Sequence, residues 1–199
     1  TEATKTVNIT VNKANAEIIL ANETLYLKAN DVVSDVAKLN PVNAGNLTFV
    51  SSNEDIALVY DGTIWARTKG NVTVTVSFEG NNNYEAAENK TITVCITPKD
   101  ARVSVENDTL DLKVNDTYEF SPTVVPNFLP VEYSSSNESV VTVTDYGFVR
   151  AVGAGTAIIT LTVGNDMTYA VNTTNVTVTV SKVFTEINLV NQTVDLKVL

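Results

Sequence analysis

Histidine is absent from this 199-residue chain, and cysteine occurs once, at Cys95. Without histidine, the commonest general base and a common zinc ligand are missing, which excludes a Ser-His-Asp triad, a Cys-His pair and a zinc site built on imidazole. A single cysteine permits no intrachain disulfide. These absences argue against most hydrolase mechanisms, and we expect no enzymatic activity.

Long apolar runs and excess positive charge are also missing. No run approaches the roughly 18 residues that would cross a bilayer, so we expect no direct membrane insertion in this fragment. The formal net charge is -10 and the pI about 4.4. A surface this acidic repels phosphate groups, which argues against nucleic acid as a partner. The chain has no initiating methionine and ends inside an apolar alternation, so we interpret it as a fragment.

What the chain does contain is a long internal repeat. The segment Asn22–Lys28 recurs as Asn107–Lys113 and again as Asn191–Lys197. Other landmarks keep the same spacing within one residue: Ser51 with Ser135, Gly62 with Gly147, Gly70 with Gly155, and Tyr84 with Tyr169. This period is too long for a solenoid repeat of roughly 20–45 residues and fits a small domain that folds by itself.

The repeat divides the chain into four parts. Residues 1–13 align with the end of each copy and are predicted to be the last strand of a preceding module. Two complete modules follow, at 14–97 and 98–182. Residues 183–199 are predicted to be the opening strands of a further module.

Within the modules, apolar and polar residues alternate with a period of two, which predicts strands with one buried face. The residues expected inside are Val72, Val74, Val76, Ile159, Leu161 and Val163, and those expected outside are Thr73, Thr75, Thr160 and Thr162. Turn signals such as Asp61-Gly62 separate the strands. No segment has sustained helical spacing, although Asp31–Leu39 could make a single turn. The pattern predicts an all-β antiparallel sandwich in each module.

Four motifs follow one another in the second module: an aromatic-x-S-S-N and a V-x-x-V in Tyr133–Val143, a G-x-V-x-A in Gly147–Ala151, and a G-x-A-x-I-T in Gly155–Thr160. In this order they resemble the bacterial immunoglobulin-like group 2 domains of surface adhesins and adhesin-like proteins. The resemblance covers most of 98–182. Module 14–97 is a looser copy, and both modules carry Phe49 or Tyr133 where the family commonly has Trp.

The resemblance implies tandem immunoglobulin-like sandwiches, and the short link at Pro98 favours stacking them as a rod. It also implies an extracellular location, at the cell surface or in the cell wall. We therefore expect a structural or adhesive segment of a secreted cell-surface protein, which extends or presents a binding region. The expected partners are neighbouring Ig-like modules of the same chain and a glycan or protein on another cell. The alternatives are a carbohydrate-binding module using exposed aromatics and a cell-wall or S-layer lattice component.

Trp65 is the only tryptophan, and it aligns with Arg150 of the second module. Because Ile64 and Ala66 are expected to face inward, Trp65 should point outward, beside Tyr60. Exposed aromatic rings of this kind could stack on a sugar or anchor a partner. The alternative is that Trp65 packs under a loop or against a neighbouring module.

Asn-x-Ser/Thr sequons recur along the chain, and three of them share one repeat position: Asn22, Asn107 and Asn191. They indicate a glycoprotein if the chain is secreted, although asparagine is also a common turn residue beside Thr-rich strands. A second group of oxygen-bearing side chains could ligate calcium: Asn81, Asn82, Asn83, Asp100, Asp108 and Asp116. None of them has the spacing of a known calcium loop, so we expect solvated turns and no cofactor.

Overall fold

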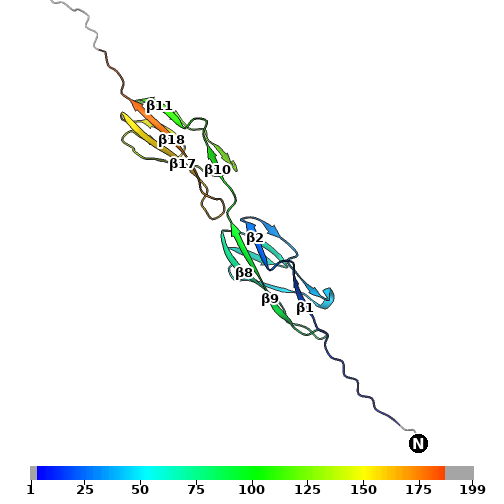
Figure 1. Ribbon diagram of the computed structural model, residues 1–199. Coiled ribbons are helices and arrows are strands. Elements are labelled where there is room, and N and C mark those ends of the chain that lie inside the picture. The colour runs from blue at the N-terminus through cyan, green and yellow to red at the C-terminus, as the bar shows by residue number, and fades with distance from the viewer. Residues whose placement is uncertain (1–3, 187–199) are drawn as a thin grey trace, which may run out of the picture. The chain divides into compact units, whose positions relative to one another are not determined.

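The structure is a computed structural model that describes residues 4–186 (Figure 1). The chain divides into two compact units. The first comprises the residues up to Ala101 together with Gly164–Val171, and the second comprises Arg102–Val163 and the chain from Asn172 onward.

The first unit contains nine strands and one short 3-10 helix, Val42–Ala44, among its described residues. Its four-stranded sheet has the order β2-β9-β8-β5, formed by Thr24–Lys28, Ala87–Thr97, Gly70–Phe78 and Thr48–Ser51. Its three-stranded sheet has the order β3-β7-β6, formed by Val32–Val33, Thr63–Ala66 and Ala57–Tyr60. A two-stranded ribbon pairs β1 (Glu17–Leu20) with β4 (Ala37–Asn40).

The second unit repeats this topology. The four-stranded sheet has the order β11-β18-β17-β14, formed by Thr109–Lys113, Asn172–Ser181, Gly155–Val163 and Glu132–Ser135. The three-stranded sheet has the order β12-β16-β15, formed by Thr117–Glu119, Phe148–Ala151 and Val141–Val143. The ribbon pairs β10 (Arg102–Ser104) with β13 (Thr123–Val125). The all-β, immunoglobulin-like prediction is confirmed.

One pairing in each unit is parallel rather than antiparallel. β2 runs beside β9 in the same direction, with registers from Thr24–Thr93 to Lys28–Thr97. β11 and β18 repeat this arrangement from Thr109–Thr177 to Lys113–Ser181. Figure 1 shows each of these pairs side by side with the long antiparallel strand, β8 or β17. The repeated motif Asn22–Lys28 is therefore the segment that forms this parallel edge.

The core of each unit lies between its sheets. All six residues that the alternation places inside are buried: Val72, Val74, Val76, Ile159, Leu161 and Val163. In the first unit, Ile64 and Ala66 of β7 belong to the same buried cluster as Val72, Val74 and Val76 and enter it from the facing sheet. The prediction for the outward residues was right for Thr73, which is exposed, but Thr75, Thr160 and Thr162 are only half-exposed. Each of these three is paired with a residue on both neighbouring strands, whereas Thr73 lies beyond the end of the β5–β8 pairing.

One local prediction was wrong. Asp31–Leu39 makes no helical turn; it contributes β3 and the start of β4, because Val32 and Val33 pair with Trp65 and Ile64. Residues 4–13 form no strand with the rest of the described chain, and their apolar side chains are exposed. The assignment of residues 1–13 to the last strand of a preceding module stays a prediction. Residues 183–186 likewise form no strand, and the remainder of the predicted opening strands lies outside the described residues.

The turn glycines Gly62 and Gly147 have φ of 70° and 79°, where L side chains are strained. Each lies over the aromatic ring of an edge strand. A methyl group on Gly147 would lie 2.8 Å from Cζ of Tyr133, whereas one on Gly62 would lie 3.4 Å from Cζ of Phe49. Tyr133 also stacks on Phe120 with ring centroids 6.1 Å apart, and burial raises the pKa of its phenol. The second unit is thus packed more tightly at this turn.

We predict that Leu161→Ala lowers the free energy of unfolding of the second unit by about 2–5 kcal/mol, because it leaves a cavity in the core. Thr160→Ala should cost only about 1 kcal/mol, since it removes one hydrogen bond, to Oδ1 of Asn175. Denaturant unfolding followed by circular dichroism measures both. Trp65 fluorescence, which reports the first unit alone, should not change. Equal costs for the two variants would show that the face assignment is wrong.

We also predict that Gly147→Ala destabilises more than Gly62→Ala. Both substitutions force a left-handed conformation at a cost of about 1–2 kcal/mol. Only Gly147→Ala also drives a methyl group into Tyr133, which adds about 1–3 kcal/mol of overpacking. The same unfolding measurement compares the two, each in its own unit. A larger loss for Gly62→Ala would contradict this account of the turn.

Candidate functional site

The outward face of the sheet β3-β7-β6 carries an apolar strip in the first unit. The pairing register places Trp65 of β7 between Val32 of β3 and Leu58 of β6. Trp65 is 36% exposed and Val32 55% exposed. The neighbours of Trp65 along the strand, Ile64 and Ala66, are buried, so the predicted outward orientation of Trp65 is confirmed.

A shallow hollow of about 520 Å³ lies over this strip. Val32, Leu58 and Trp65 form its apolar part, and its polar part is lined by Asn30, Asp31, Arg67 and Thr68. Backbone hydrogen bonds bring these two groups together: the amide of Asn30 donates to the carbonyl of Ala66 at 2.7 Å, and that of Ala66 donates to Asp31 at 2.9 Å. Asn30 adopts a positive φ of 65° to make this turn.

The polar side chains around the hollow retain hydrogen-bonding capacity. The side-chain amide of Asn30 has no hydrogen-bond partner among the described residues. The Asp31 carboxylate accepts from the backbone N–H of Lys28 at 2.9 Å and lies 3.6 Å from Nζ of Lys99. One Nη of Arg67 donates to the Glu54 carbonyl at 3.4 Å, which leaves the other guanidinium N–H groups free to donate. The hollow thus combines an aromatic floor with donors and acceptors at its rim.

Tyr60, the second predicted contact residue, is 73% exposed and pairs with Thr63. It lies on the same face as Trp65, diagonally across the β6–β7 pair, but it does not line the hollow. The structure therefore brings Trp65 together with the polar rim and leaves Tyr60 outside. Contact of either residue with a ligand stays a prediction.

The sequence reasoning missed Asn30, Asp31, Arg67 and Thr68. The sequence gives only a weak signal for these four residues. Asn30-Asp31 is typical of an ordinary turn, and Arg67-Thr68 looks like a polar end to the strand that contains Trp65. Only the pairing of β3 with β7, which are more than thirty residues apart in the sequence, places both of these polar segments beside Trp65.

The second unit has a polar surface at the same place. In the sheet β12-β16-β15, Arg150 occupies the position of Trp65, between Thr117 and Thr142. The same backbone arrangement therefore accepts either an aromatic or a charged residue at this position. The apolar strip is a property of the first unit's sequence and is not required by the fold.

Three of the six residues considered for calcium, Asn81, Asp100 and Asp116, have structural roles. Oδ1 of Asn81 accepts from the backbone N–H groups of Asn83 and Tyr84 at 2.9 and 3.0 Å, and its Nδ2 donates to the Ala44 carbonyl. Asp116 accepts from the amide of Lys113 at 2.8 Å, and Asp100 forms an ion pair with Lys28 at 2.7 Å. Within residues 4–186, no group of three or more His, Cys, Asp or Glu side chains is arranged to hold a metal ion.

The sequons differ in how their asparagines are used. Asn22 and Asn107 are exposed in the turns before β2 and β11, and their side chains make no hydrogen bond to another described residue. Asn172 is half-buried, and its Oδ1 accepts from the backbone N–H of Val103 at 2.9 Å. Asn191 lies outside the described residues.

Two paired sheets with a shared core, found twice along the chain, define a protein of tandem immunoglobulin-like β-sandwiches. Residues 93–171 match the family described as "Bacterial Ig-like domain (group 2)". This match confirms the resemblance seen in the motifs of the second module. No curated protein matches the chain.

The chain is similar to three solved structures, among others. Drosophila N-cadherin EC1–3 is 10% identical over 86% of this chain and 69% of its own, with a TM-score of 0.34. The S-layer protein rSbsC is 19% identical over 85% of this chain and 28% of its own, with a TM-score of 0.36. Sidekick-1 immunoglobulin domains 1–4 are 13% identical over 86% and 51%, with a TM-score of 0.33.

The fold class rests on the strand topology itself. The chain spans less than a third of the S-layer protein and about half of the Sidekick-1 fragment. Within the described part of the chain, no helix is long and apolar enough to cross a membrane.

Proposed function

We propose that this chain is a structural and adhesive segment of a secreted cell-surface protein, in which the modules extend or present a binding region. Its setting is the cell surface or the cell wall. Its partners are neighbouring Ig-like modules of the same protein and a glycan or protein on another cell. The chain needs no catalytic step for this role.

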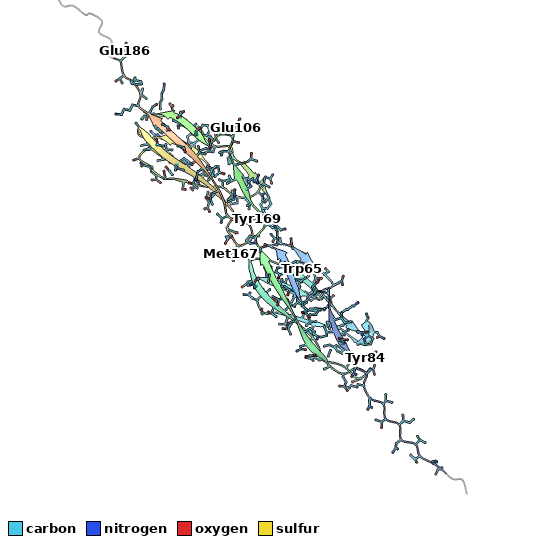
Figure 2. The ribbon with its side chains drawn as sticks, in the orientation of Figure 1. Trp65, Tyr84, Glu106, Met167, Tyr169 and Glu186 are labelled. Atoms are coloured by element: carbon cyan, nitrogen blue, oxygen red, sulfur yellow. The ribbon has the colours of Figure 1, made fainter. Side chains whose placement is uncertain are left out.

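The path of the chain through each sandwich carries this proposal. In the first unit, Ala14 is bridged to Tyr84, in the loop before β9, and Figure 2 labels Tyr84 at the end of the unit where residues 4–13 join it. β9 ends at Thr97, and the chain leaves the unit beyond this far end of the strand, after Ala101. Eleven residues of strand separate the two ends, which corresponds to about 36 Å at the usual rise of a β-strand.

The second unit is traversed in the same way. Val103 of β10 is hydrogen-bonded to Asn172, the first residue of β18. The chain then leaves after Ser181, the last residue of that strand. A module that takes in the chain at one end and releases it at the other adds its own length to the protein. Such a module suits a spacer better than a fold whose termini lie together.

This proposal is tested by small-angle scattering from the 199-residue protein. A compact body of this length has a radius of gyration of about 16 Å. We expect a value well above that, because each unit should add its strand length to the reach of the chain. A radius near that of a compact sphere would contradict a role as an extending segment.

We further propose that Asn22 and Asn107 carry glycans in a secreting host, whereas Asn172 does not. A glycan is joined to the side-chain amide nitrogen, which must therefore be reachable. Both predicted sites are exposed turn residues without a side-chain hydrogen bond in the described chain. Glycosylation of Asn172 would disturb its contact with Val103. Asn191 occupies the same repeat position as Asn22 and Asn107, so we also expect it to carry a glycan.

Peptide mass spectrometry of protein from a host with an N-glycosylation system measures site occupancy. We expect peptides that contain Asn22 and Asn107 to carry the added mass of a glycan. In the Asn22→Gln variant, the peptide of the first site should lose this mass. Thr24→Ala, which keeps the asparagine but destroys the sequon, is the matched control and should lose the same mass. Occupancy at Asn172 with bare Asn22 and Asn107 would show that exposure does not decide the pattern.

A further inference from the structure

The strongest unexplained feature is the exposed Trp65 in its hollow. Burying an outward tryptophan against a partner is favourable, whereas leaving it in water invites aggregation. The second unit shows that this sheet tolerates an arginine here, flanked by two threonines. The apolar strip of Val32, Leu58 and Trp65 is therefore not required by this sheet arrangement, which makes it a candidate for contact with a ligand.

The chemistry of the hollow defines its ligand. The face of the indole and the neighbouring aliphatic groups offer a flat apolar floor. Beside this floor lie the free amide of Asn30, which both donates and accepts, the acceptor oxygens of Asp31 and the donor groups of Arg67. An occupant must present a flat C–H surface in its middle and hydroxyl groups at its edge.

We propose that this hollow binds a neutral pyranose unit of a glycan. The sugar ring lies on Trp65, and its edge hydroxyls hydrogen-bond to Asn30 and Asp31. Because the hollow is shallow, it receives an internal unit of an oligosaccharide as readily as a terminal one. A flat peptide side chain satisfies the floor but has no ring of hydroxyls to match the rim, so we favour the sugar.

A single ring of about twelve heavy atoms in an open site supports a Kd of about 1 mM, from the usual ligand efficiency. Such weak contacts become useful when many copies act together. The site is independent of the proposed extending role: scattering tests the reach of the chain, whereas sugar binding tests this one surface.

The protein supplies its own probe, since Trp65 is its only tryptophan. We would titrate the intact 199-residue protein with trisaccharides of glucose, galactose, mannose and N-acetylglucosamine while recording tryptophan emission. We expect a saturable change with at least one of them at millimolar concentration. Glycerol at equal hydroxyl concentration has no ring and should give none.

Variants then test whether the sugar binds at this hollow. Binding is measured by saturation-transfer NMR, because the substitution of Trp65 removes the fluorophore. Trp65→Arg copies the second unit, so it should fold, as circular dichroism would verify, and should bind about ten-fold or more weakly. Asn30→Ala keeps the fluorophore and should weaken binding about three- to ten-fold. Tyr146→Ala, which removes an exposed aromatic of the second unit, should bind like the parent protein.

The proposal is overturned if none of the four trisaccharides changes the emission up to about 50 mM, some fifty times the expected Kd. It is equally overturned if Trp65→Arg, or Asn30→Ala should the first variant not fold, binds as well as the parent protein. A response of Trp65 to peptides alone would assign the hollow to a protein partner instead.

Discussion

Each sandwich depends on the parallel pairing of an early strand with its last strand. β2 lies beside β9, and β11 beside β18, over five residues each. The last strand is thereby held between two neighbours, and its alternate residues, such as Val94 and Ile96, are buried. Because both strands run in one direction, the last one carries the chain away from the end where the unit began. The parallel pairing therefore determines both the packing of the core and the path of the chain through the unit.

The two units share this arrangement of strands and differ in the residues on its outer faces. Ile64 and Ala66 correspond to Val149 and Ala151, and all four are buried. The residue between them is Trp65 in one unit and Arg150 in the other. Inward positions are constrained by close packing, in which even one methylene matters. Outward positions are free to change, and a binding surface can be added there without altering the fold.

The core could be predicted from the sequence because its signal is local: alternation places Val74 and Leu161 inside, and a turn glycine such as Gly147 needs a positive φ. The parallel pairing could not, since it joins segments about seventy residues apart. The same limit applies to the hollow, whose rim residue Asn30 reaches Trp65 only through the β3–β7 pair. It also explains the error at Asp31–Leu39, where pairing with β7 outweighed local spacing.

The chain path has a mechanical consequence. When the two ends of the first unit are pulled apart, β1 is held by its four-residue ladder to β4, and β2 and β9 are drawn in opposite directions along their common axis. Parallel neighbours loaded in this way slide rather than peel, so all the hydrogen bonds between them resist together. A hairpin pulled from its open end would instead lose its bonds one after another. Resistance to tension is therefore set by the rate at which a short ladder shears, and it can be tuned at the exposed alternate residues of β2 or β11 without changing the buried core.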